Sequence, residues 1–125
     1  MIKLVIDDTA SGSTHDTYKI FKDEDNIGRC QLRHVASKNI KMPKGFENNI
    51  YYEIMEEYRK KGYGSEVLSL LVEKARKIDL ENIIVTVKDS NVGSIKIIEK
   101  NSGILQCKEK DTHNVLYRKY LISLI

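Results

Sequence analysis

The chain has 125 residues, 41% of them hydrophobic and 31% charged, which suits one globular domain with a real core. Lysine and arginine total 21 against 18 acidic residues, and the two signs are interspersed along the whole chain. A dedicated nucleic-acid-binding domain usually concentrates basic charge on one face or motif, so the mild net charge of +3 argues against that class.

The sequence carries no pattern for export, membrane insertion or metal binding. The apolar opening, residues 1–6, meets Asp7 and Asp8 too soon for a signal-peptide core, and no later apolar run approaches membrane-spanning length. Cys30 and Cys107 lack the spacing of a zinc site or a disulfide framework, and the histidines show no ligand spacing. We expect a cytoplasmic protein, with no metal and no membrane segment.

The first third of the chain predicts short antiparallel strands. Alternating apolar residues predict a strand over 2–6, followed by a polar loop over 9–14. Strands over 17–22 and 27–35, joined by an acidic turn over 23–26, are typical of a hairpin. A calcium loop is the alternative for this turn, but the twelfth position counted from Asp23 is His34 and not the bidentate glutamate that an EF-hand needs.

The middle of the chain predicts a long connection and then a strand. Residues 36–49 contain the only proline, Pro43, and form a connection that could line a site. The strand over 50–55 alternates, so that Glu53 shares one face with Tyr51 while Tyr52 lies on the other face. For Tyr51 and Tyr52, ordinary strand packing is the simpler interpretation.

A helix after Gly64 is the clearest element. Its expected buried stripe consists of Val67, Leu68, Leu71, Ala75 and Ile78. The strand over 82–87 is dense in β-branched residues, so we expect it to be buried on both faces and central.

The carboxyl-terminal elements are a second helix and a strand pair. Residues 92–101 predict a helix with N-cap candidates over 89–91, ended by Ser102 and a C′ glycine, Gly103. Strands over 104–108 and 115–124 are expected to pair antiparallel across the turn at 111–114.

The segment Arg59-Lys60-Lys61-Gly62-Tyr63-Gly64-Ser65 lies between the strand and the first helix. The first turn of a helix has N–H groups without intrahelical partners and the positive end of the macrodipole, so it stabilises a bound phosphate. Gly62 and Gly64 let the backbone approach such a ligand. The segment lacks the third glycine of the dinucleotide fingerprint, and the chain has no P-loop.

Arg59-x-x-Gly62-x-Gly64, placed after a strand and opening a helix, resembles the acetyl-CoA signature of the GNAT superfamily of N-acetyltransferases. Residues 89–94 and 97–103 resemble the later motif of that family, with matching order and spacing. Residues 51–68 are most similar to a bacterial branch of uncharacterised predicted acetyltransferases. The resemblance covers 27–121, and the residues before it match poorly.

The resemblance implies an α/β (α+β) fold: a mixed, mostly antiparallel central sheet, two main helices and a shortened amino-terminal region. Two neighbouring parallel strands, 50–55 and 82–88, would splay apart around acetyl-CoA. Pantetheine would pair with the backbone of the first strand, and the pyrophosphate would meet the N–H groups over 60–65. The implied cofactor contacts are Ile54, Met55, Glu56, Arg59, Lys60, Lys61, Gly62, Tyr63, Gly64, Ser65, Asn91 and Ser94, with Lys96 or Lys100 near the outer phosphates.

Simpler interpretations exist for single members of this set. Lys60 and Lys61 could be solvated surface charge, Gly64 ordinary backbone relief, and Asn91 a plain N-cap. Cys30 and His34 could be imagined as a nucleophile pair, but residues four apart on a strand lie roughly 13 Å apart. We expect both to be structural.

In this family an amine attacks the thioester directly in a ternary complex. A lysine-like amine has a pKa of about 10.4, so a base is useful, and Glu53 is our hypothetical base. A backbone N–H near Met55 could stabilise the oxyanion. Many relatives carry a tyrosine on the last helix to protonate the departing thiolate; Glu99 is assigned to that position here, with Tyr117 or Tyr120 as alternatives.

Many relatives also place two helices between their first strands as a wall for the acceptor, and residues 9–16 are too short and polar for them. This predicts an acceptor site that is open or completed by a second subunit, and hence a possible homodimer. The leading prediction is an acetyl-CoA-dependent N-acetyltransferase that acts on a primary amine. A catalytically weak acetyl-CoA-binding sensor or assembly module is the alternative, and a small nucleic-acid-binding domain has no aromatic and basic motif to support it.

Overall fold

The structure is a computed structural model, which describes residues 1–37, 43 and 46–125. Its elements are β1 (Ile2–Ile6), β2 (His15–Lys22), β3 (Asp25–Ser37), β4 (Asn48–Ile54), the short 3₁₀ helix η1 (Glu56–Tyr58), α1 (Tyr63–Lys77), β5 (Asn82–Lys88), α2 (Val92–Lys100), β6 (Ile104–Lys110) and β7 (Leu116–Ser123). Every element expected from the sequence is present, with ends shifted by a few residues. The expected site-lining connection over 36–49 lies in part outside the described residues.

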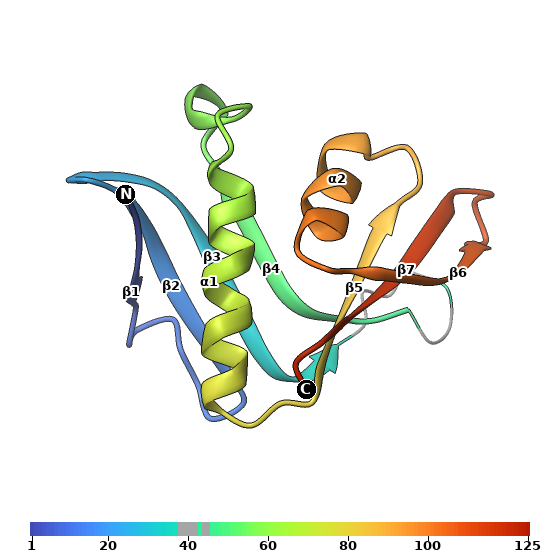
Figure 1. The fold of residues 1–125 in the computed structure, drawn as a ribbon, viewed down its shortest axis with the longest axis horizontal. Coiled ribbons are helices and arrows are strands. Elements are labelled where there is room, and N and C mark those ends of the chain that lie inside the picture. Colours follow the sequence, from blue (N-terminus) through green and yellow to red (C-terminus); the bar gives the residue numbers. More distant parts are fainter. Residues whose placement is uncertain (38–42, 44–45) are drawn as a thin grey trace.

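Within the described residues the strands form two sheets, with the orders β1-β2-β3-β4 and β5-β7-β6, and every ladder is antiparallel. The expected α+β fold with mostly antiparallel strands and two main helices is confirmed, and the expected central sheet is divided between β4 and β5. β5 lies in the middle of the molecule, between β4 and β7, but it is an edge strand of its own sheet. Figure 1 shows β4 and β5 running in the same direction and diverging towards the end where both helices begin.

Side-chain amides join the two sheets where β4 begins. The Ile84 N–H donates to Asn49 Oδ1 and the Thr86 N–H donates to Asn48 Oδ1, each at 2.8 Å. Asn49 is buried and also donates to the Arg33 carbonyl. These side chains satisfy N–H groups of β5 that a neighbouring strand would otherwise bond, so β5 stays close to β4 without a backbone ladder. Beyond these contacts β4 and β5 diverge, as Figure 1 shows.

Helix α1 covers one face of the β1–β4 sheet (Figure 1). Its buried residues Val67, Leu68, Leu71 and Ala75 are fully covered, as the periodicity predicts. The prediction for Ile78 is wrong, because this residue is the C-cap of the helix and its side chain is 39% exposed. The helix ends one residue before the apolar stripe does. The opposite face of the sheet carries no helix within the described residues.

The end of α2 differs in detail from its prediction. The left-handed residue is Ser102, with φ of 69°, and Gly103 follows it. The Gly103 N–H donates to the Ile98 carbonyl and the Ser102 N–H to the Glu99 carbonyl, which is the hydrogen-bond pattern of a Schellman motif with serine at C′. Gly103 is required for another reason: a Cβ there would lie 2.4 Å from Ile98 Cγ2.

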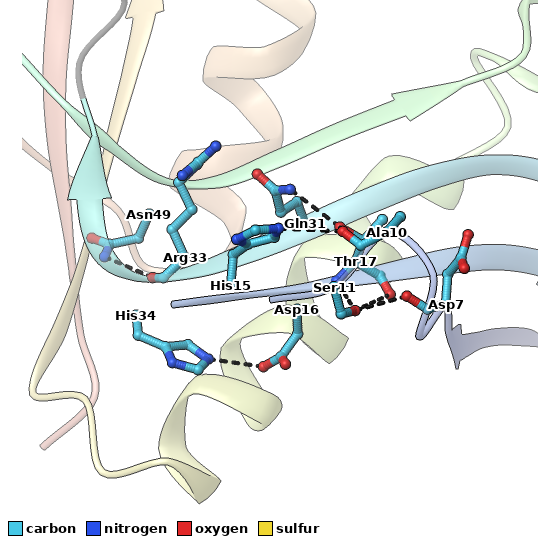
Figure 2. A network of polar contacts seen from close by, with 10 residues as sticks. All are labelled: Asp7, Ala10, Ser11, His15, Asp16, Thr17, Gln31, Arg33, His34 and Asn49. Carbon is cyan, nitrogen blue, oxygen red and sulfur yellow. Dashed lines mark hydrogen bonds and ion pairs between the residues drawn. The ribbon is translucent and has the colours of Figure 1, made fainter. Parts of the chain in front are cut away.

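The loop between β1 and β2 folds over the helix-free face of the sheet (Figure 2). Thr17 Oγ1 donates to the Ala10 carbonyl at 3.0 Å, and Ser11 Oγ donates to the Asp7 carbonyl at 2.8 Å. The Gln31 amide on β3 reaches Thr17 Oγ1, and the His15 ring contacts the Ala10 carbonyl. Hydrogen bonds thus hold this short polar loop in place, and it contains no helix, as the sequence predicts.

Gly28 on β3 offers a test of how closely β3 and β4 approach. A Cβ at this position would lie 2.1 Å from the Glu53 carbonyl oxygen and 3.0 Å from Ile54 Cα. We expect Gly28→Ala to lower the free energy of unfolding by about 3 kcal/mol, because backbone atoms must move to admit the methyl group. Urea unfolding followed by circular dichroism measures this. Gly93→Ala is the control: nothing lies within 4 Å of its Cβ, so helix propensity should leave stability unchanged or raise it by up to about 1 kcal/mol.

Candidate active site

The amino terminus of α1 is an uncapped helix start. Gly62 is its N-cap in the left-handed conformation, with φ of 84°, and makes no side-chain cap hydrogen bond. Lys60 is also left-handed, with φ of 61°, so the chain turns sharply into the helix. The first N–H with an intrahelical partner is that of Glu66, which donates to the Gly62 carbonyl at 3.5 Å. The N–H groups of the first helical turn precede this bond and are therefore available to a ligand.

This helix start opens into a groove of about 620 Å³, which we call the loop groove. Its lining residues are Tyr52, Glu53, Ile54, Tyr58, Arg59, Lys60, Gly62, Tyr63, Gly64, Asn91, Gly93, Ser94 and Ile97. The predicted phosphate segment and the start of α2 thus face the same space. Gly64 is buried, and a Cβ there would lie 2.9 Å from Ile97 Cδ1, so the glycine allows the start of α1 to approach α2.

A second groove, of about 560 Å³, lies between β4 and β5, and we call it the strand groove. Its lining residues are Asn48, Ile50, Tyr51, Tyr52, Val85, Thr86, Val87, Lys88, Asn91, Ser94, Ile98 and Tyr117. Tyr52, Asn91 and Ser94 line both grooves. Asn91 is the N-cap of α2, as the simpler interpretation predicts, because its Oδ1 accepts from the Ser94 N–H at 3.2 Å. The two grooves together therefore lead from the helix starts to the space between the diverging strands.

One edge of β4 faces this space. The Met55 N–H donates to the Ile27 carbonyl at 2.7 Å, and Glu53 stands opposite Arg29 in the same ladder. Since alternate residues of an antiparallel strand direct their polar groups to the same side, the backbone of Glu53 and Met55 points to β3. The backbone of Tyr52 and Ile54 consequently points away from β3, towards β5.

This geometry bears on two predictions for the end of β4, the oxyanion donor near Met55 and the backbone contacts with pantetheine. The Met55 N–H is already bonded and cannot serve as the oxyanion donor in this conformation. Of the three residues expected along pantetheine, only Ile54 lines the loop groove; Met55 lies on the other face of the sheet, and Glu56 is exposed on η1. The Arg59 guanidinium turns back to donate from Nε to the Ile54 carbonyl at 2.7 Å. Arg59 therefore anchors the loop to the end of β4 while lining the groove.

Glu53 connects the loop groove with the helix-free face of the sheet. On that face lies a third groove, of about 470 Å³, which we call the open-face groove. Its lining residues are Asp7, Ala10, Thr17, Tyr18, Lys19, Asn26, Gly28, Arg29, Glu53 and Met55. Tyr51 donates its hydroxyl hydrogen to Glu53 Oε2 at 2.8 Å, and this bond raises the pKa of Tyr51. Glu53 is thus held by a neighbour and is exposed to both spaces.

Glu99 does not fit the role of acid for the departing thiolate. Its Oε2 accepts the Tyr120 hydroxyl hydrogen at 2.8 Å, and Arg118 donates to both Tyr120 and Asp89. This network lies between α2 and β7, and neither Glu99 nor Tyr120 lines the loop or strand groove. Ile98, one position earlier, does line the strand groove, as does Ser94 one turn before it. Helical phase decides this, since adjacent residues on a helix point in directions about 100° apart.

The remaining predicted cofactor residues take other positions. Lys61 lies over the Tyr58 ring, with Nζ 5.8 Å from the ring centre. The Ser65 hydroxyl and carbonyl accept from the Asn101 amide, which joins α1 to α2. Lys96 and Lys100 are exposed on α2, and neither lines a described groove. Tyr51 and Tyr52, for which strand packing was the simpler interpretation, both line the strand groove, and Tyr52 shares its strand face with the buried Ile50 and Ile54.

Cys30 and His34 do not form a nucleophile pair. Burial raises the pKa of the Cys30 thiol to about 12, and His34 Nε2 lies 2.9 Å from Asp16 Oδ2. Among the described residues, no group of three or more histidine, cysteine or acidic side chains is placed to hold a metal ion.

The two cysteines should differ sharply in reactivity, because the thiolate is the reactive species. Cys30 is 1% exposed and Cys107 is exposed on β6. At pH 8 we expect a thiol-specific reagent to modify Cys107 in the native protein and to reach Cys30 only after unfolding. Mass spectrometry of the labelled peptides gives the result, and Cys107→Ser should have no rapidly reacting thiol. Rapid labelling of Cys30 in the native protein would show that the core around β3 opens readily.

The fold and the grooves define a class: a small α+β domain whose diverging parallel strands lie beside a glycine-opened helix start. A model of the GNAT acetyltransferase domain matches residues 3–102, and the chain belongs to this family. The match begins within β1, so it includes amino-terminal strands that the motifs alone left outside the resemblance. No curated protein matches the chain by sequence.

Solved structures agree on the fold. A Bacillus subtilis acetyltransferase in complex with CoA has a TM-score of 0.72 at 14% identity, with 99% of this chain and 98% of that chain covered. A Salmonella typhimurium acetyltransferase described as putative, with acetyl-CoA, has a TM-score of 0.67 at 12% identity, with 89% and 65% covered. A spermidine N-acetyltransferase chimera from Vibrio cholerae and hSSAT has a TM-score of 0.73 at 12% identity, with 94% and 72% covered. The chain thus spans slightly less than two thirds of the Salmonella chain.

Proposed function

We propose that this chain transfers an acetyl group from acetyl-CoA to a primary amine of a small molecule, peptide or protein, by direct attack in a ternary complex. The observation that carries this proposal is the position of Glu53, which lines both the loop groove and the open-face groove. A donor on one side and an amine on the other would meet at this residue.

The donor side is supported by the helix start of α1. The pyrophosphate would accept hydrogen bonds from the N–H groups of the first turn, beside Arg59 and Lys60, because no side chain caps that turn. Pantetheine would follow the outward-facing edge of β4 at Ile54 and Tyr52 and pass Asn91 and Ser94. Acetyl-CoA and CoA accompany the Salmonella and Bacillus structures, which supports this donor.

The acceptor side is supported by the open-face groove. Glu53 would take a proton from the attacking amine, directly or through water. The N–H groups of Tyr52 and Ile54, which point away from β3, would face the carbonyl oxygen as it gains negative charge. The loop over 7–14 would form one wall of this groove, since hydrogen bonds hold it against β2.

Thiol release with acetyl-CoA and an amine panel tests the proposal. The panel should include spermidine, lysine-containing peptides and peptide amino termini, with an acylated amine as the negative control. We expect CoA release that depends on the free amine and an acetylated product of the expected mass. Tight acetyl-CoA binding without release across the panel would instead support the sensor or assembly module.

A second subunit that completes the acceptor wall stays a prediction. Light scattering at the assay concentration gives the oligomeric state, and a monomer with full activity on a small amine would contradict it.

None of the helices in the described part of the chain is long and apolar enough to cross a membrane. A cytoplasmic location is part of the proposal, in keeping with two free cysteines.

A further inference from the structure

Tyr52 occupies the junction of the two donor grooves. It lies on the β4 face that packs against the helices, and its ring is near the α1 start: a Cβ on Gly64 would lie 3.7 Å from Tyr52 Cε2. Its side chain is half-buried, and it lines both the loop groove and the strand groove. No other tyrosine among the described residues lines both grooves.

The departing thiolate needs a proton source, and the helix α2 does not provide one. Ser94 and Ile98 are the α2 residues that line the strand groove; Ile98 has no proton to give, and the aliphatic hydroxyl of Ser94 is a much weaker acid than a phenol. Glu99 and Tyr120 are bonded to each other outside both grooves. Tyr117 lines only the strand groove, from β7. Tyr51 also lines only the strand groove, and Tyr58 and Tyr63 line only the loop groove. Among the described residues, Tyr52 is therefore the phenol that lines both parts of the path that a donor would take.

The surroundings of Tyr52 keep its phenol protonated at neutral pH. Burial raises the pKa of Tyr52, and a hydrogen bond with the Ser94 side chain opposes this shift. The titratable and charged groups that share its two grooves are Tyr51 and Glu53 on β4, Tyr58 on η1, Arg59 and Lys60 before α1, Tyr63 on α1, Lys88 on β5 and Tyr117 on β7.

We propose that Tyr52 is the catalytic acid that protonates the departing CoA thiolate. This inference rests on the proposed acetyl transfer. The amine nitrogen forms its bond to the acetyl carbon, the carbon–sulfur bond breaks with its electron pair on sulfur, and the Tyr52 hydroxyl hydrogen moves to that sulfur. The phenolate regains the proton that the amine releases through Glu53 or water. The products are an amide and free CoA thiol, and no other reactant is consumed.

The first test is Tyr52→Phe, which keeps the ring and removes the proton. We expect kcat to fall about 100-fold while the Kd for acetyl-CoA stays within about threefold, because the phenol acts on the leaving group and not on the bound donor. Tyr120→Phe is the matched control and should keep the wild-type kcat, since its hydroxyl lies outside the grooves. Tyr117→Phe tests the competing phenol and should keep most of the activity.

The second test replaces Tyr52 with a site-specifically incorporated fluorotyrosine, which is nearly the same size and more acidic. The kcat at saturating amine falls at high pH as the phenol loses its proton, and this limb should move to lower pH by the difference in phenol acidity. A full kcat in Tyr52→Phe, or a limb that does not move, would overturn the assignment. Loss of activity in Tyr117→Phe alone would transfer the role to that residue. Absence of thiol release in the wild-type protein would overturn acetyl transfer and this assignment together.

Discussion

Gly62→Glu should raise the Kd for acetyl-CoA about 30-fold or more. The substituted carboxylate would lie at the N-cap of α1, where the pyrophosphate is proposed to accept hydrogen bonds from backbone N–H groups. A like charge about 6 Å away costs about 2 to 3 kcal/mol at an effective dielectric constant near 20, and about 1.4 kcal/mol corresponds to tenfold in Kd. Isothermal titration of acetyl-CoA into the purified variant measures the change.

The matched control for this variant is Gly62→Gln. Both side chains have nearly the same size and impose the same strain on a residue with φ of 84°, and nothing lies within 4 Å of the Cβ in either case. The comparison therefore isolates the charge. We expect the glutamine variant to bind several-fold more weakly than wild type and much more tightly than the glutamate variant. The difference in Kd between the two variants should become smaller in high salt, because salt screens the charge of the glutamate. Equal affinities for the two variants would place the pyrophosphate elsewhere.

Local patterns in the sequence were enough to predict the elements. The stripe of α1 from Val67 to Ala75, the β-branched run of β5 and the β6–β7 pair all have the positions that period and turn chemistry predict. The spacing from Arg59 to Gly64 predicted where the helix begins and to which family the chain belongs. These features depend on residues close together in the chain, so a single sequence contains them.

The division into two sheets could not be predicted in the same way. It depends on Asn48 and Asn49, whose side chains bond N–H groups of β5 some 35 residues later. Nothing local distinguishes these asparagines from loop residues. The same long-range packing decides that the Met55 N–H is bonded to Ile27, so the motif alone could not say which N–H near Met55 is available as a donor.

The site residues on α2 show how helical phase limits motif transfer. A shift of one residue rotates a side chain by about 100°, which moves Glu99 out of the groove and brings Ile98 into it. Strand phase is simpler, because residues alternate between two faces. The sequence therefore placed Glu53 and Tyr51 on the correct face, and the structure shows that Tyr52, on the other face, is a groove residue and not only core packing.

Glu53→Gln should lower kcat with a basic amine about 100-fold and leave the Kd for acetyl-CoA unchanged. Glutamine keeps the shape and can still accept the Tyr51 hydroxyl hydrogen, but it cannot take a proton from the attacking ammonium. The defect should shrink for acceptors whose ammonium pKa is lower, because a larger fraction of such amines is already deprotonated. Steady-state rates over a series of amines of graded pKa measure both effects.

Glu57→Gln is the control for the loss of one negative charge near the site. Glu57 is exposed on η1 and lines none of the three grooves defined here, so its variant should match wild type across the amine series. A Glu53→Gln defect of the same size for every amine would indicate that Glu53 positions the acceptor and does not remove its proton. An unchanged kcat would exclude Glu53 from both roles, and the meeting point of donor and acceptor would then have to lie in the strand groove, beside Tyr51 and Tyr117.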